Sequence, residues 1–252
     1  MHDSVKVTFI QFINNYMTSN DSVKVLEVGS LNVNGGLRDL KPDNFAWYGI
    51  DLVDGPGVDQ KIDVAELYPF SDDTFDLVVA SSVFEHDIEF WSSFLEMCRV
   101  LKQDGIILLI MPSQGTFHRY PLDAFRFYPD AGLALEKWAN RNNAKVRLIE
   151  SFTTLPTNEV WADFVAIFSG RIVEISESKY IGSQLSGENW IVDGNLVEHT
   201  YQELPIELRR LKQLENRIIE LEKNQNPDPK EQLSVKRIVR KVWTRIRHTN
   251  FG

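Results

Sequence analysis

Two long apolar runs constrain the fold of this chain more than any other feature. FDLVVASS (75–82) and GIILLIMP (105–112) are apolar almost throughout and do not alternate with polar residues. Such runs are typical of central strands in a parallel sheet that is covered on both faces. Apolar residues at helical spacing predict helices over 4–18, 87–101 and 129–143. This alternation predicts an α/β fold with a doubly wound sheet.

Five further segments complete the predicted sheet, giving about seven strands by pattern alone. They are residues 23–29, 47–51, 61–64, 146–152 and 163–170. Ligands of such sheets bind beyond the carboxyl ends of the strands. The residues that follow each strand are therefore the candidates for function.

Composition excludes several classes of protein. The chain is 43% hydrophobic and 25% charged, which is a globular balance and not that of a disordered protein. The single cysteine, Cys98, excludes an internal disulfide framework and a cysteine-rich zinc site, so we expect a reducing, cytoplasmic location. No apolar stretch is long enough to span a membrane, and the first residues do not resemble a signal peptide.

Charge is distributed unevenly along the chain. The net charge is −9, from 27 Lys and Arg against 36 Asp and Glu. Residues 233–252 contain six of the cations and no acid, which leaves 21 cations against 36 acids, or −15, in residues 1–232. An acidic body argues against generic nucleic-acid binding, and we expect no nucleic-acid partner.

The turns after the first three strands suggest a nucleotide-type ligand. Gly29 ends the first strand, but Leu31 stands where a dinucleotide site would have its second glycine, so a plain tight turn is an equal alternative. Asp51 ends the second strand, where an acid can accept both hydroxyls of a ribose. Asp63 and Val64 follow the third, where they could frame an adenine. A surface acid and an Asx turn are the alternatives.

Titratable side chains gather after the fourth and fifth strands. Glu85 and His86 follow the fourth strand, and a loop dense in His, Arg, Asp and aromatic residues (113–130) follows the fifth. Histidine is the side chain best matched to general-base chemistry near neutral pH. A helix entry at His86 and an ion-pair network within the loop are the alternatives.

Together these segments resemble the class I S-adenosylmethionine-dependent methyltransferases, most closely their type 11 group. The resemblance is carried by VLEVGS (25–30), GIDL (49–52), residues 62–87 and RVLKQDGIILLIMPS (99–113). It implies an enzyme with a seven-stranded Rossmann-like sheet, whose last strand, 163–170, runs antiparallel. It also implies S-adenosylmethionine as the cofactor. The departure is Leu31-Asn32-Val33, which replaces the usual glycines.

The resemblance also assigns roles to individual residues. Glu27 and Gly29 would face the methionine part of the cofactor, and Ser81 would lie at its sulfonium end. Asp51 would hold the ribose, and Asp63 and Val64 would frame the adenine. Ser30 and Leu52 complete the predicted cofactor-binding set.

We expect the acceptor to be a hydroxyl of a sugar or of a surface polysaccharide or other glycan. The candidate catalytic residues are His118, His86 and Asp123, with Asp123 orienting an imidazole. Arg119, Tyr120 and Arg126 are candidates for acceptor binding. No clustered metal-ligand spacing stands out, so no metal site is predicted. The alternatives are another small-molecule acceptor, or a non-catalytic adaptor with a degenerate cofactor domain.

The pattern divides the chain into five segments. We expect a methyltransferase domain (1–185), a connector (186–202), a short coiled-coil helix (203–224), a linker (225–232) and a basic amphipathic helix (233–252), the last three forming a C-terminal helical extension. Residues 203–224 carry Leu and Ile on a seam of sevens, which predicts a homo-oligomer. A helix packed on its own domain is the alternative.

The basic amphipathic helix has the composition of a helix that lies on an anionic membrane surface, with Trp243 as an interfacial anchor. We therefore expect a cytoplasmic protein that is peripheral at the inner face of the membrane. A glycan-assembly protein with an acidic groove is the rival partner.

Overall fold

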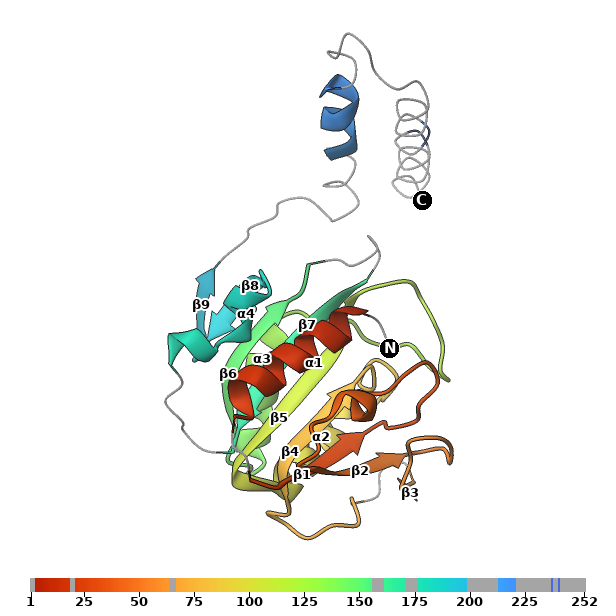
Figure 1. Ribbon diagram of the computed structural model, residues 1–252, viewed down its shortest axis with the longest axis vertical. Coiled ribbons are helices and arrows are strands. Elements are labelled where there is room, and N and C mark those ends of the chain that lie inside the picture. Colours follow the sequence, from red (N-terminus) through yellow and green to blue (C-terminus); the bar gives the residue numbers. More distant parts are fainter. Residues whose placement is uncertain are drawn as a thin grey trace. The chain divides into compact units, whose positions relative to one another are not determined.

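A single mixed sheet organises the larger of the two units into which the chain divides, Met1–Thr200 and Tyr201–Gly252 (Figure 1). The computed structural model describes residues 3–18, 21–63, 67–155, 161–170, 176–198 and 213–220, together with 237 and 240. The strands are β1 (Val23–Val28), β2 (Phe45–Asp51), β3 (Gln60–Lys61), β4 (Phe75–Ser81), β5 (Leu101–Gln114), β6 (Arg147–Thr153), β7 (Ala162–Ser169), β8 (Glu188–Val192) and β9 (Asn195–Glu198). The helices are α1 (Asp3–Tyr16), α2 (Phe90–Val100), α3 (Asp130–Arg141) and α4 (Ile181–Gln184), with 3₁₀ turns η1 (Leu37–Leu40) and η2 (Glu177–Lys179).

The strand order is that of a doubly wound sheet with an added edge. It runs β3-β2-β1-β4-β5-β7-β6-β8-β9. The first five strands pair in parallel, whereas β7 runs antiparallel to both β5 and β6. The α/β fold predicted from the sequence is confirmed, and so is the antiparallel strand within residues 163–170.

The predicted count of seven strands was wrong, because the described residues form nine. The two additional strands, β8 and β9, lie within residues 186–202, which we expected to be a connector, so the sheet continues beyond residue 185. Asp193 and Gly194 join them with φ values of 49° and 78°. An Asp-Gly pair with positive φ at both positions is a preferred two-residue hairpin turn. The Asp-Gly pair was a sequence signal for this hairpin. Its surroundings are largely polar, so the two short strands were not recognised from the pattern.

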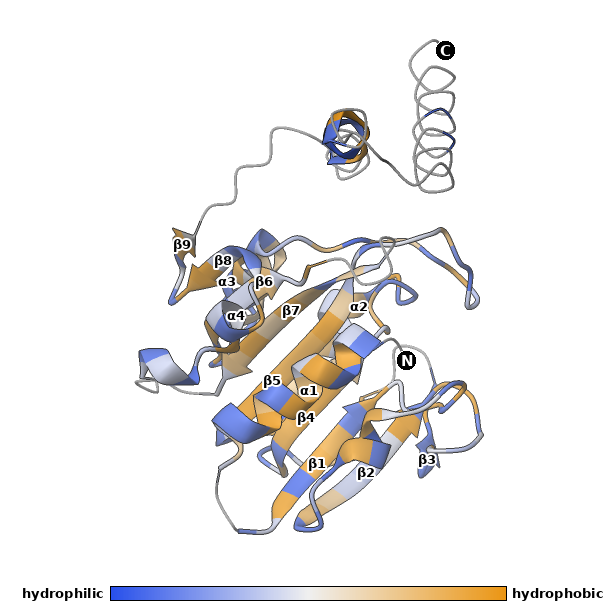
Figure 2. Ribbon diagram, turned by 45° about the horizontal axis from the view of Figure 1, so that its top comes forward, coloured by the Kyte–Doolittle hydropathy of each residue, from blue (hydrophilic) through white to orange (hydrophobic). Residues whose placement is uncertain are grey.

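Helices cover both faces of the sheet, and each face has its own apolar core. On one face, Phe94 and Met97 of α2 lie with residues of α3 and the strands in one buried cluster. On the other, Phe9 and Phe12 of α1 belong to a second cluster that includes residues of η1 and α4. Figure 2 shows the central strands as predominantly apolar, as expected for strands covered on both faces.

A buried carboxylate ties the added hairpin to the rest of the domain. Glu150 of β6 is fully buried and accepts hydrogen bonds from Tyr16 Oη (2.6 Å), the Ile181 and Gly182 backbone N–H groups (2.8 and 3.0 Å) and Trp190 Nε1 (2.8 Å). Burial raises the pKa of this carboxyl above its ordinary value. One side chain thus connects α1, β6, α4 and β8.

The smaller unit is described only over a short helix. Residues 213–220 are helical, with Leu214 and Ile218 half-buried and an ion pair between Arg217 and Glu220 (3.1 Å). The rest of the predicted coiled coil, the linker and, apart from Arg237 and Arg240, the basic helix lie outside the described residues. No helix among the described residues is long and apolar enough to cross a membrane.

Two features of β1 position the edge of the sheet at which ligands are expected. The first is Gly29, which follows the strand with φ +74°. A Cβ atom at this position would lie 2.2 Å from Val83 Cγ2, so only glycine lets the turn after β1 meet the segment after β4.

The second feature is Glu27, a buried carboxyl whose Oε2 accepts a hydrogen bond from Trp47 Nε1 (2.8 Å). Burial raises the pKa of Glu27 to about 7, although the Trp47 hydrogen bond acts in the opposite direction. Glu27 thus keeps its proton in the native state over a pH range in which it is ionised in the unfolded chain.

We predict that Gly29→Ala destabilises the protein more than Gly35→Ala. Gly35 also has a positive φ (+92°), but no heavy atom lies within 4 Å of a Cβ placed there. Gly35→Ala should therefore cost only the backbone strain, about 1–2 kcal/mol. Gly29→Ala should cost at least about 1 kcal/mol more, because the methyl group overlaps Val83. Denaturant unfolding of both variants measures the difference. Equal losses, or no recovery when Val83→Ala is added to Gly29→Ala, would contradict this account.

We also predict that Glu27→Gln changes how stability depends on pH. Between pH 4.5 and 7 the Glu27 carboxyl binds fewer protons in the unfolded wild-type chain than in the native state. The contribution of Glu27 to the free energy of unfolding therefore falls as pH rises. Over that window the variant should gain about 3 kcal/mol relative to wild type. Chemical unfolding at several pH values tests this, with the exposed carboxyl variant Glu89→Gln as control. A constant difference between wild type and variant would refute it.

Candidate functional site

The carboxyl ends of β1, β2 and β4 form one edge of the sheet. β1 lies between the other two and pairs in parallel with both, so Gly29, Asp51 and Ser81 follow or end neighbouring strands at a similar level. Asp63 follows β3 and is exposed. Val64, the other residue predicted to frame an adenine, lies outside the described residues.

Asp51 closes the turn after β1. Its carboxylate accepts hydrogen bonds from the backbone N–H groups of Leu31 (2.9 Å) and Val53 (3.2 Å). A carboxylate offers about four acceptor positions, so roughly half of its capacity remains for a ligand. Leu52 and Val53 beside it are exposed, at 46% and 57%, and provide apolar surface next to a polar acceptor.

Three glycines explain how the unusual sequence of this turn is accommodated. A Cβ atom on Gly49 would lie 2.5 Å from Ser30 Oγ, one on Gly57 2.6 Å from the Ser30 carbonyl oxygen, and one on Gly55 2.4 Å from Leu31 Cδ1. The end of β2 and the segment after it therefore pack closely against Ser30 and Leu31. Ser30 Oγ is buried without a hydrogen-bond partner in the structure. The close packing that glycines usually provide within the first turn is here provided by glycines on the neighbouring segment.

A second group of side chains lies where the segments after β4 and β5 meet. The backbone N–H of Ala124 donates to the Glu85 carbonyl (2.7 Å), and Nδ1 of His86 contacts the Leu122 carbonyl oxygen. The rings of His86 and His118 meet edge to face, with centroids 5.0 Å apart. The loop that follows β5 is thereby held against the segment that follows β4.

Glu85 and His86 are perturbed by burial. Only 1% of Glu85 is exposed, its Oε2 lacks a hydrogen-bond partner in the structure, and burial raises its pKa to about 8. Burial lowers the pKa of His86, which favours the neutral imidazole. A buried acid and a neutral imidazole side by side are typical of functional sites.

His118 is oriented by its own loop. Its Nδ1 lies 3.1 Å from the Thr116 carbonyl oxygen and 3.5 Å from Asp123 Oδ2, and its backbone N–H donates to the same carboxylate oxygen (2.7 Å). Arg126 binds both oxygens of Asp123 through its two terminal nitrogens and holds the pKa of that carboxyl well below its usual range. The ion-pair network considered from the sequence is therefore present, and it engages Arg126 within the loop.

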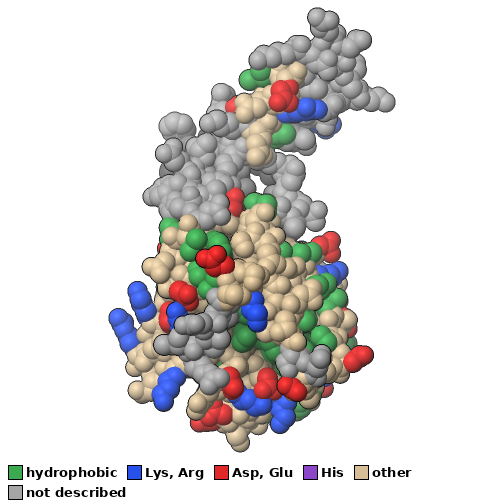
Figure 3. Space-filling model, turned by 60° about the vertical axis from the view of Figure 1, so that its left-hand side comes forward, with side chains coloured by type: hydrophobic (Ala, Val, Ile, Leu, Met, Phe, Trp, Pro, Cys, Tyr) green, Lys and Arg blue, Asp and Glu red, His purple; other side chains and the backbone are tan. Residues whose placement is uncertain are grey.

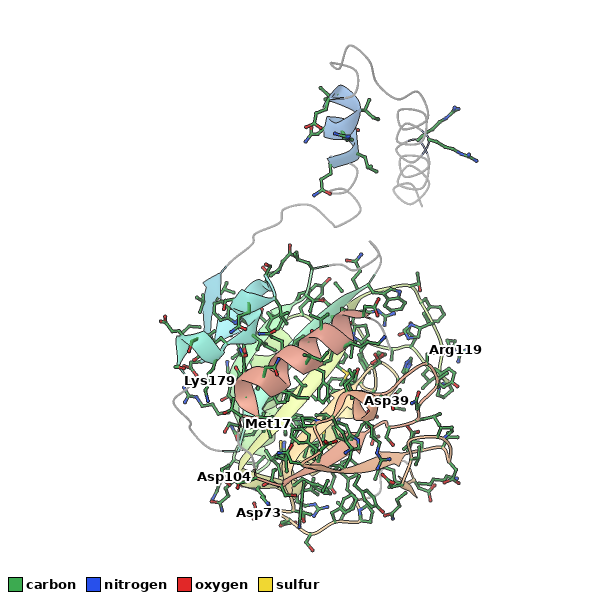
Figure 4. The ribbon with its side chains drawn as sticks, viewed as in Figure 1. Met17, Asp39, Asp73, Asp104, Arg119 and Lys179 are labelled. Atoms are coloured by element: carbon green, nitrogen blue, oxygen red, sulfur yellow. The ribbon has the colours of Figure 1, made fainter. Side chains whose placement is uncertain are left out.

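The other residues predicted to bind the acceptor, Arg119 and Tyr120, are exposed. Figure 4 shows Arg119 at the outer edge of the loop, at the opposite end of the sheet from Asp73 and Asp104. Sequence reasoning missed Trp161, whose ring lies 5.3 Å from that of His118. Gly115 gives the indole room, since a Cβ atom there would lie 2.1 Å from it.

Comparison with known protein families matches one part of the domain. Residues 48–109 match the family model described as a methyltransferase domain. None of the curated proteins matches the chain.

Three solved structures illustrate the structural likeness. The 1,6-didemethyltoxoflavin-N1-methyltransferase of Burkholderia thailandensis, solved with S-adenosylhomocysteine, is 14% identical, with 67% of this chain and 83% of that chain covered and a TM-score of 0.47. A SAM-dependent methyltransferase of Aquifex aeolicus is 16% identical, with 66% and 89% covered and a TM-score of 0.42. The YcgJ protein of Bacillus subtilis is 13% identical, with 67% and 97% covered and a TM-score of 0.46.

Because these TM-scores are all below 0.5, the assignment of the domain depends on the family match to residues 48–109. The resemblance to methyltransferases, and with it the predicted enzyme class, is confirmed on residues 48–109, which match a methyltransferase domain.

Proposed function

We propose that this enzyme methylates a hydroxyl oxygen of a sugar or glycan. One observation carries the proposal: Glu85, His86 and His118 gather just beyond Val83, the residue that would touch a Cβ atom on Gly29. Groups that can accept a proton thus lie beside the turn at which a methyl donor is expected. Transfer to a hydroxyl needs such a group, whereas many other acceptors need only positioning.

The residues at the sheet edge fit the cofactor. S-adenosylmethionine supplies an electrophilic methyl group on a sulfonium sulfur, together with a neutral adenosine and an ammonium group. The unused acceptor positions of Asp51 suit the ribose hydroxyls, and Glu27, Gly29 and Ser30 would face the methionine part. Leu52 would pack beside the ribose. We assign the adenine to Asp63 and Val64 and the sulfonium end to Ser81.

His118 would accept the hydroxyl proton. A carbonyl oxygen can only accept a hydrogen bond, so the contact with Thr116 places the His118 proton on Nδ1 and leaves the Nε2 lone pair available. Asp123 maintains this orientation through the His118 backbone N–H. His86, with its Nδ1 on the Leu122 carbonyl, is the second candidate base.

The exposed face of the loop after β5 supports a sugar acceptor. Phe117, Tyr120 and Tyr128 are 75%, 62% and 68% exposed. Aromatic rings with polar neighbours suit a sugar, which has apolar C–H faces and hydroxyl edges. Arg119 would bind an anionic group such as a phosphate or a carboxylate on the acceptor. These features favour a polysaccharide precursor over an apolar small molecule.

For the C-terminal part we propose self-association through residues 203–224. We also propose that residues 233–252 bind an anionic membrane surface, or a glycan-assembly protein, at the cytoplasmic face. The heptad seam and the six cations support these roles. On the face of the molecule drawn in Figure 3, acidic and basic side chains are interspersed.

We predict that Asp51→Asn weakens binding of S-adenosylmethionine by about 1–3 kcal/mol, because the amide offers one acceptor oxygen where the carboxylate offers two. Titration calorimetry measures this change, and Asp54→Asn, an exposed acid three residues away, is the matched control. Equal affinity in Asp51→Asn and wild type would remove Asp51 from the ribose site. A folded wild-type chain that gives no heat at all would favour the adaptor alternative.

We predict that His118→Gln lowers kcat by roughly 10²- to 10⁴-fold while the affinity for the cofactor is unchanged, because the variant lacks the proton acceptor. Transfer of labelled methyl groups to a panel of nucleotide-linked sugars and oligosaccharides provides the assay. Arg119→Gln is the comparison variant and should raise KM for anionic acceptors instead. An unchanged kcat in His118→Gln would exclude His118 as the base.

A further inference from the structure

Three side chains that can ligate a metal converge at one point in the described structure. One ligand atom from each of Glu85, His86 and His118 lies within 4.8 Å of those of the other two. Glu85 and His86 come from the segment after β4, and His118 comes from the loop after β5. Glu85 Oε1 and His86 Nε2 are 3.6 Å apart.

Both imidazoles are already oriented as metal ligands usually are. Nδ1 of His86 contacts the Leu122 carbonyl oxygen, and Nδ1 of His118 lies 3.1 Å from the Thr116 carbonyl oxygen. Each contact places the ring proton on Nδ1 and leaves the lone pair on Nε2. In metal sites, a ligating histidine usually donates a hydrogen bond from its other ring nitrogen to a carbonyl oxygen or carboxylate, which fixes the orientation of the ring.

Glu85 provides a second, independent observation that points to a cation. The residue is 1% exposed, and within the described structure its Oε2 is a buried oxygen without a hydrogen-bond partner. Leaving such an oxygen unsatisfied is costly. The guanidinium of Arg126 is bound instead to both oxygens of Asp123. A cation at the meeting point would lie against Glu85 Oε1, the oxygen that is 3.6 Å from His86 Nε2, and would offset the burial of the whole carboxylate.

We propose that Glu85, His86 and His118 bind one divalent transition-metal ion of the zinc type. Two imidazole nitrogens and one carboxylate form the ligand set of catalytic zinc sites, which keep a fourth position open. Nitrogen ligands argue against Mg²⁺ and Ca²⁺, which prefer oxygen. Ligands of a tetrahedral zinc ion lie about 3.3 Å apart, so the three groups must close slightly around the ion. The side chain of His118 is 38% exposed and has room to turn.

The consequence for catalysis depends on the proposed function, although binding of the ion does not. An acceptor hydroxyl at the open position would lose its proton to solvent more readily, because the metal ion stabilises the alkoxide. In that state His118 is a ligand and not the base. In the metal-free protein the His118 imidazole would accept the hydroxyl proton instead. The metal-bound and metal-free states are therefore alternative ways to deprotonate the acceptor.

The test uses the untagged full-length chain, freed of metal with a chelator. Zinc is titrated in competition with a chromophoric chelator, and Co²⁺ is added separately to record the visible bands of a four-coordinate site. We expect one zinc ion per chain. Glu85→Gln and His118→Ala should each weaken binding by at least about tenfold and abolish the Co²⁺ bands. His199→Ala, at a histidine outside the described residues, is the control for zinc held elsewhere.

Thermal unfolding of each variant confirms that it is folded before its affinity is interpreted. The proposal is overturned if wild type binds no zinc, if folded Glu85→Gln and His118→Ala bind it as tightly as wild type, or if His199→Ala loses it equally. Zinc binding without methylation of any hydroxyl would reject the proposed function alone. Methylation by a chain that binds no zinc would reject the metal site alone.

Discussion

The close contact between the Gly29 backbone and the Val83 side chain is the constraint on which the rest of the site depends. It exists because β1 and β4 are adjacent parallel strands whose carboxyl ends lie at the same level. It brings the turn expected to hold a cofactor next to the segment that carries Glu85 and His86. A methyl donor and its acceptor could therefore bind next to each other within one domain.

Buried carboxyl groups show how the protein separates structural from chemical roles. Glu150 accepts four hydrogen bonds and connects four elements, so its polar atoms are satisfied within the fold. Asp123 is similarly engaged, by Arg126 and the His118 backbone. Glu85 is buried as deeply, yet one of its oxygens has no partner in the structure. Among the buried acids just compared, all within the described part of the chain, only Glu85 has such an oxygen, and we expect a ligand there.

Sequence patterns predicted the central part of the fold well and its added edge poorly. The apolar runs at β4 and β5 could belong only to strands covered on both faces, and both were placed within a few residues of their observed bounds. β8 and β9 have short, mixed sequences, and their strand structure depends on the pairing of β8 with β6 and of β9 with β8, which a local pattern does not show. Their hairpin turn, Asp193-Gly194, was the one local signal.

The sequence by itself determined the α/β class and the residue types that end each strand, because these depend on local periodicity and spacing. Only the tertiary structure decided which of those residues meet. Glu85 and His118 are 33 positions apart, and they converge because β4 and β5 are neighbouring parallel strands. For that reason the sequence alone did not show that these side chains meet. The same reasoning applies to Leu31. Its side chain fits in the turn after β1 because Gly55, in another loop, packs against it. Contacts between distant segments are set by the topology of the sheet, which no local pattern encodes.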